Sequence, residues 1–263
     1  MGWKLYDHMI EGIPAEVRVT DHCLGLCWSY VEAECGMGVA YTCRGGATTS
    51  SAPADLRGMP LRDVAALAKS WRFEEATLGI AALNAWYSQP RRVDALGARY
   101  DEPVELPDGT VRKQDAFEVM RPRVEAFARE TGRPANVVVV GHFPHVDRIA
   151  EYANLTVLER TCRDGLDTPD PACEYVMPEA DFAFITGVTL ENKTAPRLLE
   201  LAKGAHVCMV GPSVVMAPAL LEAGVSLMAG SVVHDPDRTR HAVKAGNGQL
   251  FGKALQMVTI DRQ

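Results

Sequence analysis

The side chains best suited to chemistry follow three short apolar runs in the second half of the sequence. The runs cover residues 136–141, 181–187 and 206–211, and each ends in a glycine. Apolar runs bounded by turn residues are typical of parallel strands buried on both faces, and the periodic segments between them predict right-handed βαβ units. Ligands bind at the carboxyl ends of the strands in such sheets. We therefore expect one ligand-binding edge, beside the loops that begin at Gly141, Gly187 and Gly211.

The loop after the second run is unusually rich in polar groups. Asn192 or Thr194 is a suitable N-cap for the helix expected at 194–203. A cap does not need five polar side chains, so we expect part of this loop to contact a ligand. The loop contains Thr186, Thr189, Asn192, Lys193 and Thr194.

Ser213 follows the third run, at an expected helix start where N–H groups could bind an anion. It could equally serve as a helix cap. The surrounding sequence Gly-Pro-Ser-Val-Val lacks the G-x-S-x-G pattern of a hydrolase nucleophile, which argues against serine hydrolysis.

Glu159 ends the strand expected at 155–159. In nucleotide-binding sheets an acid near this position binds ribose hydroxyls. However, the first loop lacks G-x-G-x-x-G, and Pro144 removes one N–H donor. An adenosine-containing ligand without a cradled pyrophosphate, such as S-adenosylmethionine, remains one interpretation. The other is an ion pair between Glu159 and Arg160 or Arg163 on the surface.

Candidate metal ligands lie on the same edge. His142 and His145 flank a proline in the first loop, and Cys162 and Cys173 lie in the long loop of residues 160–174. Imidazole and thiolate ligands suit Zn, Ni or Cu. Neither His-x-x-x-His nor Cys-x-x-Cys spacing is present, so an exposed histidine pair is the alternative. A second group, formed by Cys23, Cys27, Cys35 and Cys43, lacks zinc-ribbon spacing and is interpreted as small buried hydrophobes.

The first half of the chain predicts a different architecture. We expect a helix entering a strand in residues 1–20, two or three antiparallel strands in 22–49, and helices at 61–70 and 73–87. Asn84 lies in the second of these helices among small apolar residues, where it could anchor a neighbouring loop or contact a ligand. The fold class is therefore α/β, with an α+β domain in residues 1–130 and a parallel-sheet domain in residues 131–263.

Composition narrows the class of protein. The chain has 263 residues, 47% of them apolar and 23% charged, with a net charge of −7. An acidic balance argues against a general nucleic-acid or anionic-membrane binder. The sequence has no apolar stretch near the roughly 20 residues of a membrane span, and no signal-peptide core, which predicts a cytoplasmic protein. Seven cysteines, an odd number, suggest reduced thiols. A homodimer is plausible.

Several blocks together resemble a prokaryotic family known as "putative heavy-metal chelation". They are the sequences at residues 186–194 (TGVTLENKT), 210–213 (VGPS) and 227–233 (LMAGSVV). The first loop, GHFP at 141–144, is similar to that family's first strand exit. The helix at 76–85 and the glycine-rich turn at 36–42 are similar to parts of its amino-terminal domain.

The resemblance implies a domain like the amino-terminal domain of enolase, followed by a Rossmann-like domain, with a pocket between them. It also implies that the pocket is lined by Asn84, Gly141, Phe143, Thr186, Thr189, Asn192, Thr194, Gly211 and Ser213. Our first hypothesis is a small-ligand-binding protein that handles a metal ion or a metal-chelating molecule. The alternative is an enzyme that uses an adenosine-containing cofactor in metal or metal-cofactor metabolism.

Overall fold

A computed structural model describes residues 2–102, 104–105, 111–112, 115–163, 165–248 and 254–262. Residues 2–87 form what we call the small domain. It contains a three-stranded antiparallel sheet in the order β1-β2-β3. Its elements are α1 (Gly2–Glu11), β1 (Val19–Cys23), β2 (Trp28–Ala33), β3 (Gly36–Tyr41), α2 (Leu61–Ala65), the 3₁₀ helix η1 (Ala66–Lys69) and α3 (Phe73–Tyr87). These elements confirm the predicted antiparallel strands and paired helices.

Helix α3 is the centre of the small domain. It is rich in small side chains, and ten of its residues are buried, so it packs closely on several sides. Gly38 in β3 shows how close this packing is, because a Cβ atom there would lie 2.1 Å from the backbone nitrogen of Ala85. Glu74 and Glu75 in the first turn favour the helix dipole.

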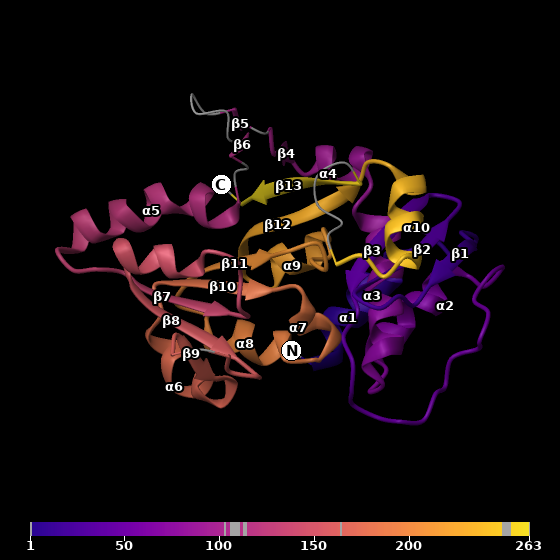
Figure 1. Cartoon of the computed structure of the whole chain (residues 1–263), viewed down its shortest axis with the longest axis horizontal. Coiled ribbons are helices and arrows are strands. Elements are labelled where there is room, and N and C mark those ends of the chain that lie inside the picture. The colour runs from indigo at the N-terminus through magenta and orange to yellow at the C-terminus, as the bar shows by residue number, and fades with distance from the viewer. Residues whose placement is uncertain are drawn as a thin grey trace.

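The large domain is built on an eight-stranded sheet in the order β4-β13-β12-β11-β10-β7-β8-β9 (Figure 1). Its continuous parallel part comprises β9 (Asp167–Pro169), β8 (Asn154–Glu159), β7 (Asn136–Val140), β10 (Phe182–Thr186), β11 (His206–Val210) and β12 (Val225–Val233). Strands β13 (Leu255–Asp261) and β4 (Arg99–Tyr100) are antiparallel at one edge. The order β8-β7-β10-β11-β12 places a topological switch point between β7 and β10, where doubly wound sheets bind ligands.

Both faces of the parallel sheet are covered, as its apolar runs predict. Val137 and Val139 pack on the side of α5 (Ala116–Thr131) and of the 3₁₀ helix η2 (Val146–Glu151). Val138 faces the opposite core, which also receives α8 (Ala195–Leu201), α9 (Pro218–Glu222) and the buried face of α1. That second core contains residues of both domains, so the two domains share one hydrophobic cluster.

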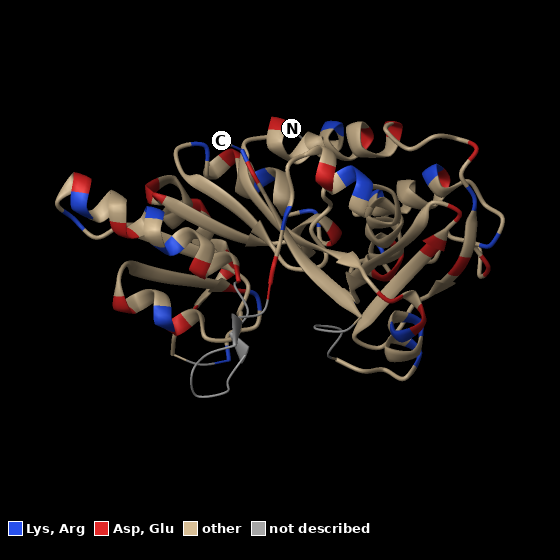
Figure 2. Ribbon diagram, turned by 90° about the horizontal axis from the view of Figure 1, so that it is seen from above, with Lys and Arg blue, Asp and Glu red and all other residues tan. Residues whose placement is uncertain are grey.

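The last helix, α10 (Pro236–Lys244), returns from the large domain to the small sheet. Arg240 lies 2.6 Å from Glu32, and Lys244 lies 3.6 Å from Asp21. In Figure 2 charges of both signs are spread over the helices and loops, whereas the central strands of the large sheet carry almost none.

Several segments differ from their predicted structure. The segment expected to be one long loop contains β9, the 3₁₀ helix η3 (Asp170–Ala172) and α6 (Cys173–Val176), because its backbone pairs with the edge of β8. A short helix, α7 (Val188–Glu191), begins directly after β10. Strand β4 and nearly all of helix α5 lie before residue 131, and both pack on the large sheet. The remaining elements are α4 (Pro90–Ala95), β5 (Val104–Glu105), β6 (Val111–Arg112) and η4 (Met177–Glu179). Within the described ranges, no helix has the length and apolar character to cross a bilayer.

Candidate functional site

A group of polar side chains lies where the loops after β10 and β11 meet α3 and the end of β3. Two close approaches hold these elements together. A Cβ atom on Gly187 would lie 2.4 Å from the backbone nitrogen of Val214, so α7 begins directly against the loop after β11. Across the domains, the Ser213 hydroxyl accepts a hydrogen bond of 2.8 Å from the Tyr41 N–H. These contacts fix the large domain's loops on the small domain.

Glu191, the last residue of α7, is fully buried between the domains. Its Oε2 atom lies 3.2 Å from the Thr77 hydroxyl of α3, and its Oε1 atom has no hydrogen-bond partner among the described residues. Burial raises the pKa of the carboxyl group to about 8, against the effects of Ser213, Thr77, Lys193 and the Cys43 N–H, which favour ionisation. Glu191 is therefore a buried acid whose Oε1 atom makes no hydrogen bond within the described residues, although the Ser213 hydroxyl and the Cys43 N–H are close enough to favour its carboxylate form.

Lys193 lies two residues further along in a left-handed backbone conformation, with φ of 68°. Its ammonium group donates a 2.5 Å hydrogen bond to the backbone oxygen of Glu191 and lies 5.6 Å from the centroid of the Phe73 ring. Burial lowers its pKa to about 8, although Glu191 and Cys43 act in the opposite direction. The left-handed turn thus directs a cation back toward the domain interface.

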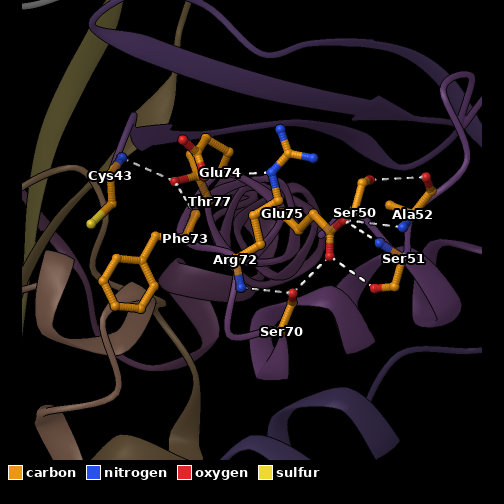
Figure 3. A network of polar contacts seen from close by, with 10 residues as sticks. All are labelled: Cys43, Ser50, Ser51, Ala52, Ser70, Arg72, Phe73, Glu74, Glu75 and Thr77. Carbon is orange, nitrogen blue, oxygen red and sulfur yellow. Dashed lines mark hydrogen bonds and ion pairs between the residues drawn. The ribbon is translucent and has the colours of Figure 1, made fainter. Parts of the chain in front are cut away.

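Cys43 contributes a thiol beside the same group. Its N–H donates to the Thr77 hydroxyl at 3.1 Å, as Figure 3 shows. Burial raises the pKa of its thiol to about 11, and the charge of Glu191 acts in the same direction, whereas Arg160 and Lys193 oppose it. The thiol is therefore protonated at neutral pH and is a poor nucleophile there.

The side chain of Asn84 links the two domains by hydrogen bonds. Its side-chain amide donates to the Val39 carbonyl at 2.9 Å and to the Pro212 carbonyl at 3.3 Å, and its Oδ1 atom accepts from Ser88. These bonds engage both ends of the side-chain amide. Asn84 thus anchors the loop after β11, the structural role that the sequence left open.

The polar loop after β10 is largely bonded to itself. The Thr189 hydroxyl donates to the Thr186 carbonyl at 2.7 Å. Asn192 Oδ1 accepts from both the N–H and the hydroxyl of Thr194, at 3.1 and 2.7 Å. Thr194 occupies the N-cap position of α8, yet its side chain makes no capping bond because its hydroxyl donates to Asn192. These contacts shape the turn that carries Lys193.

The switch point of the sheet lies beside this loop. Gly141, with φ of 102°, takes a conformation that favours glycine, and a Cβ atom there would lie 3.2 Å from the side chain of Thr186. Phe143 packs against Phe117 of α5, with ring centroids 5.5 Å apart. Gly211, with φ of 104°, ends the next strand. The three glycine-bearing loops therefore do leave the same edge of the sheet.

Glu159 organises the loop around it. Its Oε2 atom accepts from the His142 N–H at 3.1 Å, and its Oε1 atom accepts from the N–H groups of Arg160 and Thr161 at 2.9 and 3.3 Å. Both carboxylate oxygens thus bind backbone donors. The carboxylate therefore stabilises the backbone of the loops that follow β7 and β8.

Two of the predicted metal ligands, His142 and Cys162, lie beside Glu159, where each has another hydrogen-bond partner. His142 Nδ1 lies 2.7 Å from Asp167 Oδ1, and the Cys162 thiol donates to the Glu159 carbonyl at 3.7 Å. His145 is exposed and precedes η2 with φ of 60°. Within the described part of the chain, no three His, Cys, Asp or Glu side chains gather closely enough to hold a metal ion. The residues present therefore do not fit a preformed metal centre.

A surface hollow of about 500 Å³ lies elsewhere. It is lined by Pro90, Tyr100, Val232, Val233, His234 and Gln256 and includes none of the side chains around Glu191. The sequence did not single out Glu191 or Thr77, and it indicated Cys43 only as a small buried hydrophobe. Thr77 had a detectable signal, because it is a polar residue in the same apolar helix as Asn84, but Glu191 resembles a surface residue in sequence.

The fold and these loops define a two-domain α/β protein, and the comparisons place it in a family. The chain belongs to the family described as "Putative heavy-metal chelation": that family's sequence profiles match residues 6–87 and 125–259. An uncharacterized protein of Methanocaldococcus jannaschii is 28% identical over 261 residues, with 94% of this chain and 91% of the relative covered.

Two crystal structures of family proteins of unknown function share the fold. The structure from Desulfitobacterium hafniense has 32% identity and a TM-score of 0.84, and the alignment covers 98% of each chain. The structure from Pyrococcus horikoshii has 22% identity and a TM-score of 0.76, also with 98% of each chain covered. The second likeness concerns the fold alone.

Proposed function

We propose that this protein binds a small organic ligand of the metal-chelating kind at the contact between its two domains. The observation that carries the proposal is the buried Oε1 atom of Glu191, which has no hydrogen-bond partner among the described residues. Buried polar atoms in folded proteins are nearly always bonded, and an exception calls for an explanation such as a ligand or water. A ligand N–H or O–H group would satisfy this oxygen.

An organic ligand explains the surroundings of Glu191 better than a bare ion does. The neighbouring groups are a hydroxyl, a protonated thiol and an ammonium group, on Thr77, Cys43 and Lys193. Heavy-metal ions prefer thiolate, imidazole and carboxylate ligands, and no group of three such residues is found in the described ranges. The family description would then refer to the ligand's chelating chemistry rather than to protein ligands.

An adenosine-containing cofactor is the second candidate. The switch point between β7 and β10, beside Gly141, is where doubly wound sheets bind such cofactors. Against it, the carboxylate of Glu159 already accepts three backbone hydrogen bonds, which use most of its capacity to bind ribose hydroxyls. This candidate predicts a different released compound and is tested in the same experiment.

The test is to purify the protein without a histidine tag and divide one sample. One part is denatured and its released compounds are identified by mass spectrometry; the other is analysed for metals. We expect an organic compound with several nitrogen or oxygen donors, near one per chain. Lys193→Ala should reduce its retention about tenfold, a loss of about 1.4 kcal/mol of binding energy. Lys203→Ala, at an exposed position, should not.

Three results would contradict the proposal. Release of an adenosine compound would favour the cofactor enzyme. About one metal ion per chain without an organic compound, lost in a His142→Ala/Cys162→Ala variant, would indicate direct chelation by the protein. Equal retention in the Lys193→Ala and wild-type proteins would place the ligand elsewhere.

A further inference from the structure

The hydroxyl group of Thr77 is surrounded by more acceptors than it has protons. Its Oγ1 atom accepts from the Cys43 N–H at 3.1 Å. It also lies 3.0 Å from the Phe73 carbonyl, 3.5 Å from the Tyr41 carbonyl and 3.2 Å from Oε2 of Glu191. A hydroxyl has a single proton and two lone pairs. If that proton goes to the nearest carbonyl, only a proton on Glu191 makes the contact with Oε2 a hydrogen bond.

The position of Lys193 agrees with a neutral acid. Its ammonium group binds the backbone oxygen of Glu191 rather than the carboxyl group. An ionised carboxylate without a partner is costly to bury, and a proton removes that cost. Burial of Glu191 also favours the protonated carboxyl group, because it raises the pKa to about 8.

We propose that Glu191 and Lys193 form the proton-transfer pair of the interdomain site. Glu191 is protonated when the site is empty and passes its proton to a basic nitrogen or an oxyanion of the ligand, which then contacts Oε1 as an N–H or O–H donor. The O–H bond of the carboxyl group breaks, a new N–H or O–H bond forms on the ligand, and nothing is oxidised or reduced. The ammonium group of Lys193 then balances the new carboxylate. This inference rests on the proposed function and names the chemistry of its ligand.

The other titratable groups around Glu191 do not compete for this role. Tyr6 of α1 donates its hydroxyl to the Leu190 carbonyl at 2.7 Å, and burial, together with the charge of Glu191, raises its pKa. The Cys43 thiol has a pKa raised to about 11. Arg160 and Glu74 act on the pKa of the Cys43 thiol in opposite directions, Arg160 lowering it and Glu74 raising it. Lys193 is thus the neighbour whose charge changes in the same pH range as that of Glu191.

Infrared difference spectroscopy of the ligand-free protein tests the pair. The spectrum of the wild type minus that of Glu191→Gln should show the C=O stretch of a protonated carboxyl group, which disappears as pH rises through about 8. Glutamine resembles the protonated acid in shape, so this variant should fold. Glu75→Gln is the matched control: Glu75 is also buried, but its carboxylate accepts several hydrogen bonds and is ionised, so its loss should leave the band unchanged.

Lys193 variants test the pairing itself. Lys193→Met should move the loss of the band to higher pH by about one unit, since a nearby cation favours the carboxylate. Lys193→Arg should largely restore the wild-type titration. A wild-type spectrum without the band below pH 8, or a titration indifferent to Lys193→Met, would overturn the inference. Either result is independent of whether a compound is released on denaturation, so failure of the pair and failure of the proposed ligand are distinguishable.

Discussion

Glu191 and Thr77 meet across the domain interface, 3.2 Å apart, although 114 residues separate them in the sequence. The contact places an acid from the large domain on the central helix of the small domain. Because both residues are fully buried, neither can exchange this partner for water. Their contact therefore couples the position of the candidate site to the packing of the two domains.

Removal of the Thr77 hydroxyl should weaken the interface. Thr77→Val keeps the shape of the side chain but leaves the Cys43 N–H and Glu191 without their partner, which should cost about 2 kcal/mol of unfolding free energy. In a double-mutant cycle with Glu191→Met, measured by urea denaturation, we expect a coupling energy of about 1 kcal/mol. Thr239→Val, at an equally buried threonine of α10, should be additive with Glu191→Met. Additivity at both threonines would mean that the contact contributes nothing to stability.

The shifted pKa values of Glu191 and Lys193 predict that the free energy of unfolding has a minimum near pH 8. The pKa of Glu191 is raised from 4.5 to about 8, so the folded state binds more protons in that range and stability falls as pH rises through it. The pKa of Lys193 is lowered from 10.5 to about 8, so the unfolded state binds more protons above pH 8 and stability rises again. Thermal unfolding across pH measures this profile. Glu191→Gln should remove the fall below pH 8 and keep the rise above it; an unchanged profile would contradict the assignment.

Glu75 is a second buried acid, and its contribution to stability should depend on pH in the opposite direction to that of Glu191. Glu75 accepts hydrogen bonds from Ser50, Ser51, Ala52 and Ser70, as Figure 3 shows. Burial acts to raise its pKa, but these bonds lower it to about 2. Its contribution to stability is therefore complete above the unfolded value of 4.5 and is lost as pH falls toward 2.

Glu75→Gln should reduce the unfolding free energy at neutral pH by about 3 kcal/mol, because an amide cannot accept all of these bonds. It should also weaken the acid dependence of stability in chemical denaturation. Glu74→Gln changes the adjacent residue, whose ion pair with Arg72 at 3.7 Å is long, and should change stability little. Equal effects of the two substitutions would show that the network around Glu75 adds no stability.

The close contact between β3 and α3 predicts a steric effect at Gly38. An added Cβ atom would lie 2.1 Å from the nitrogen of Ala85 and 2.3 Å from the carbonyl oxygen of Ala81, and backbone atoms cannot move aside easily. Gly38→Ala should lower the unfolding free energy by about 3 kcal/mol. Gly204→Ala is the control, because nothing lies within 4 Å of a Cβ atom there. Similar melting temperatures for both variants would contradict this packing.

The sequence predicted most of the architecture because its signals were local. The apolar run at Asn136–Val140 gave a buried strand, and the small residues of Phe73–Tyr87 gave a central helix. The pairing of β9 with β8 was missed because its segment, Asp167–Pro169, is short and polar and gains its conformation from the strand edge. Glu191 was missed for a related reason: its burial arises from the small domain, which no pattern near residue 191 reveals.

The last prediction distinguishes a residue that stabilises the fold, Val138, from a residue of the candidate ligand site, Asn192. Val138 is 2% exposed in the middle of β7, so Val138→Asp removes apolar burial and adds an unpaired charge to the core. We expect a loss of more than about 4 kcal/mol, enough to unfold the large domain. Asn192→Ala removes only the two bonds to Thr194, at a half-buried turn, and should cost about 1 kcal/mol while it weakens retention of the ligand. Circular dichroism melts, together with mass spectrometry of released compounds, compare the two variants. If Asn192→Ala lowered the melting temperature as far as Val138→Asp does, Asn192 would be structural and the ligand site would lie elsewhere.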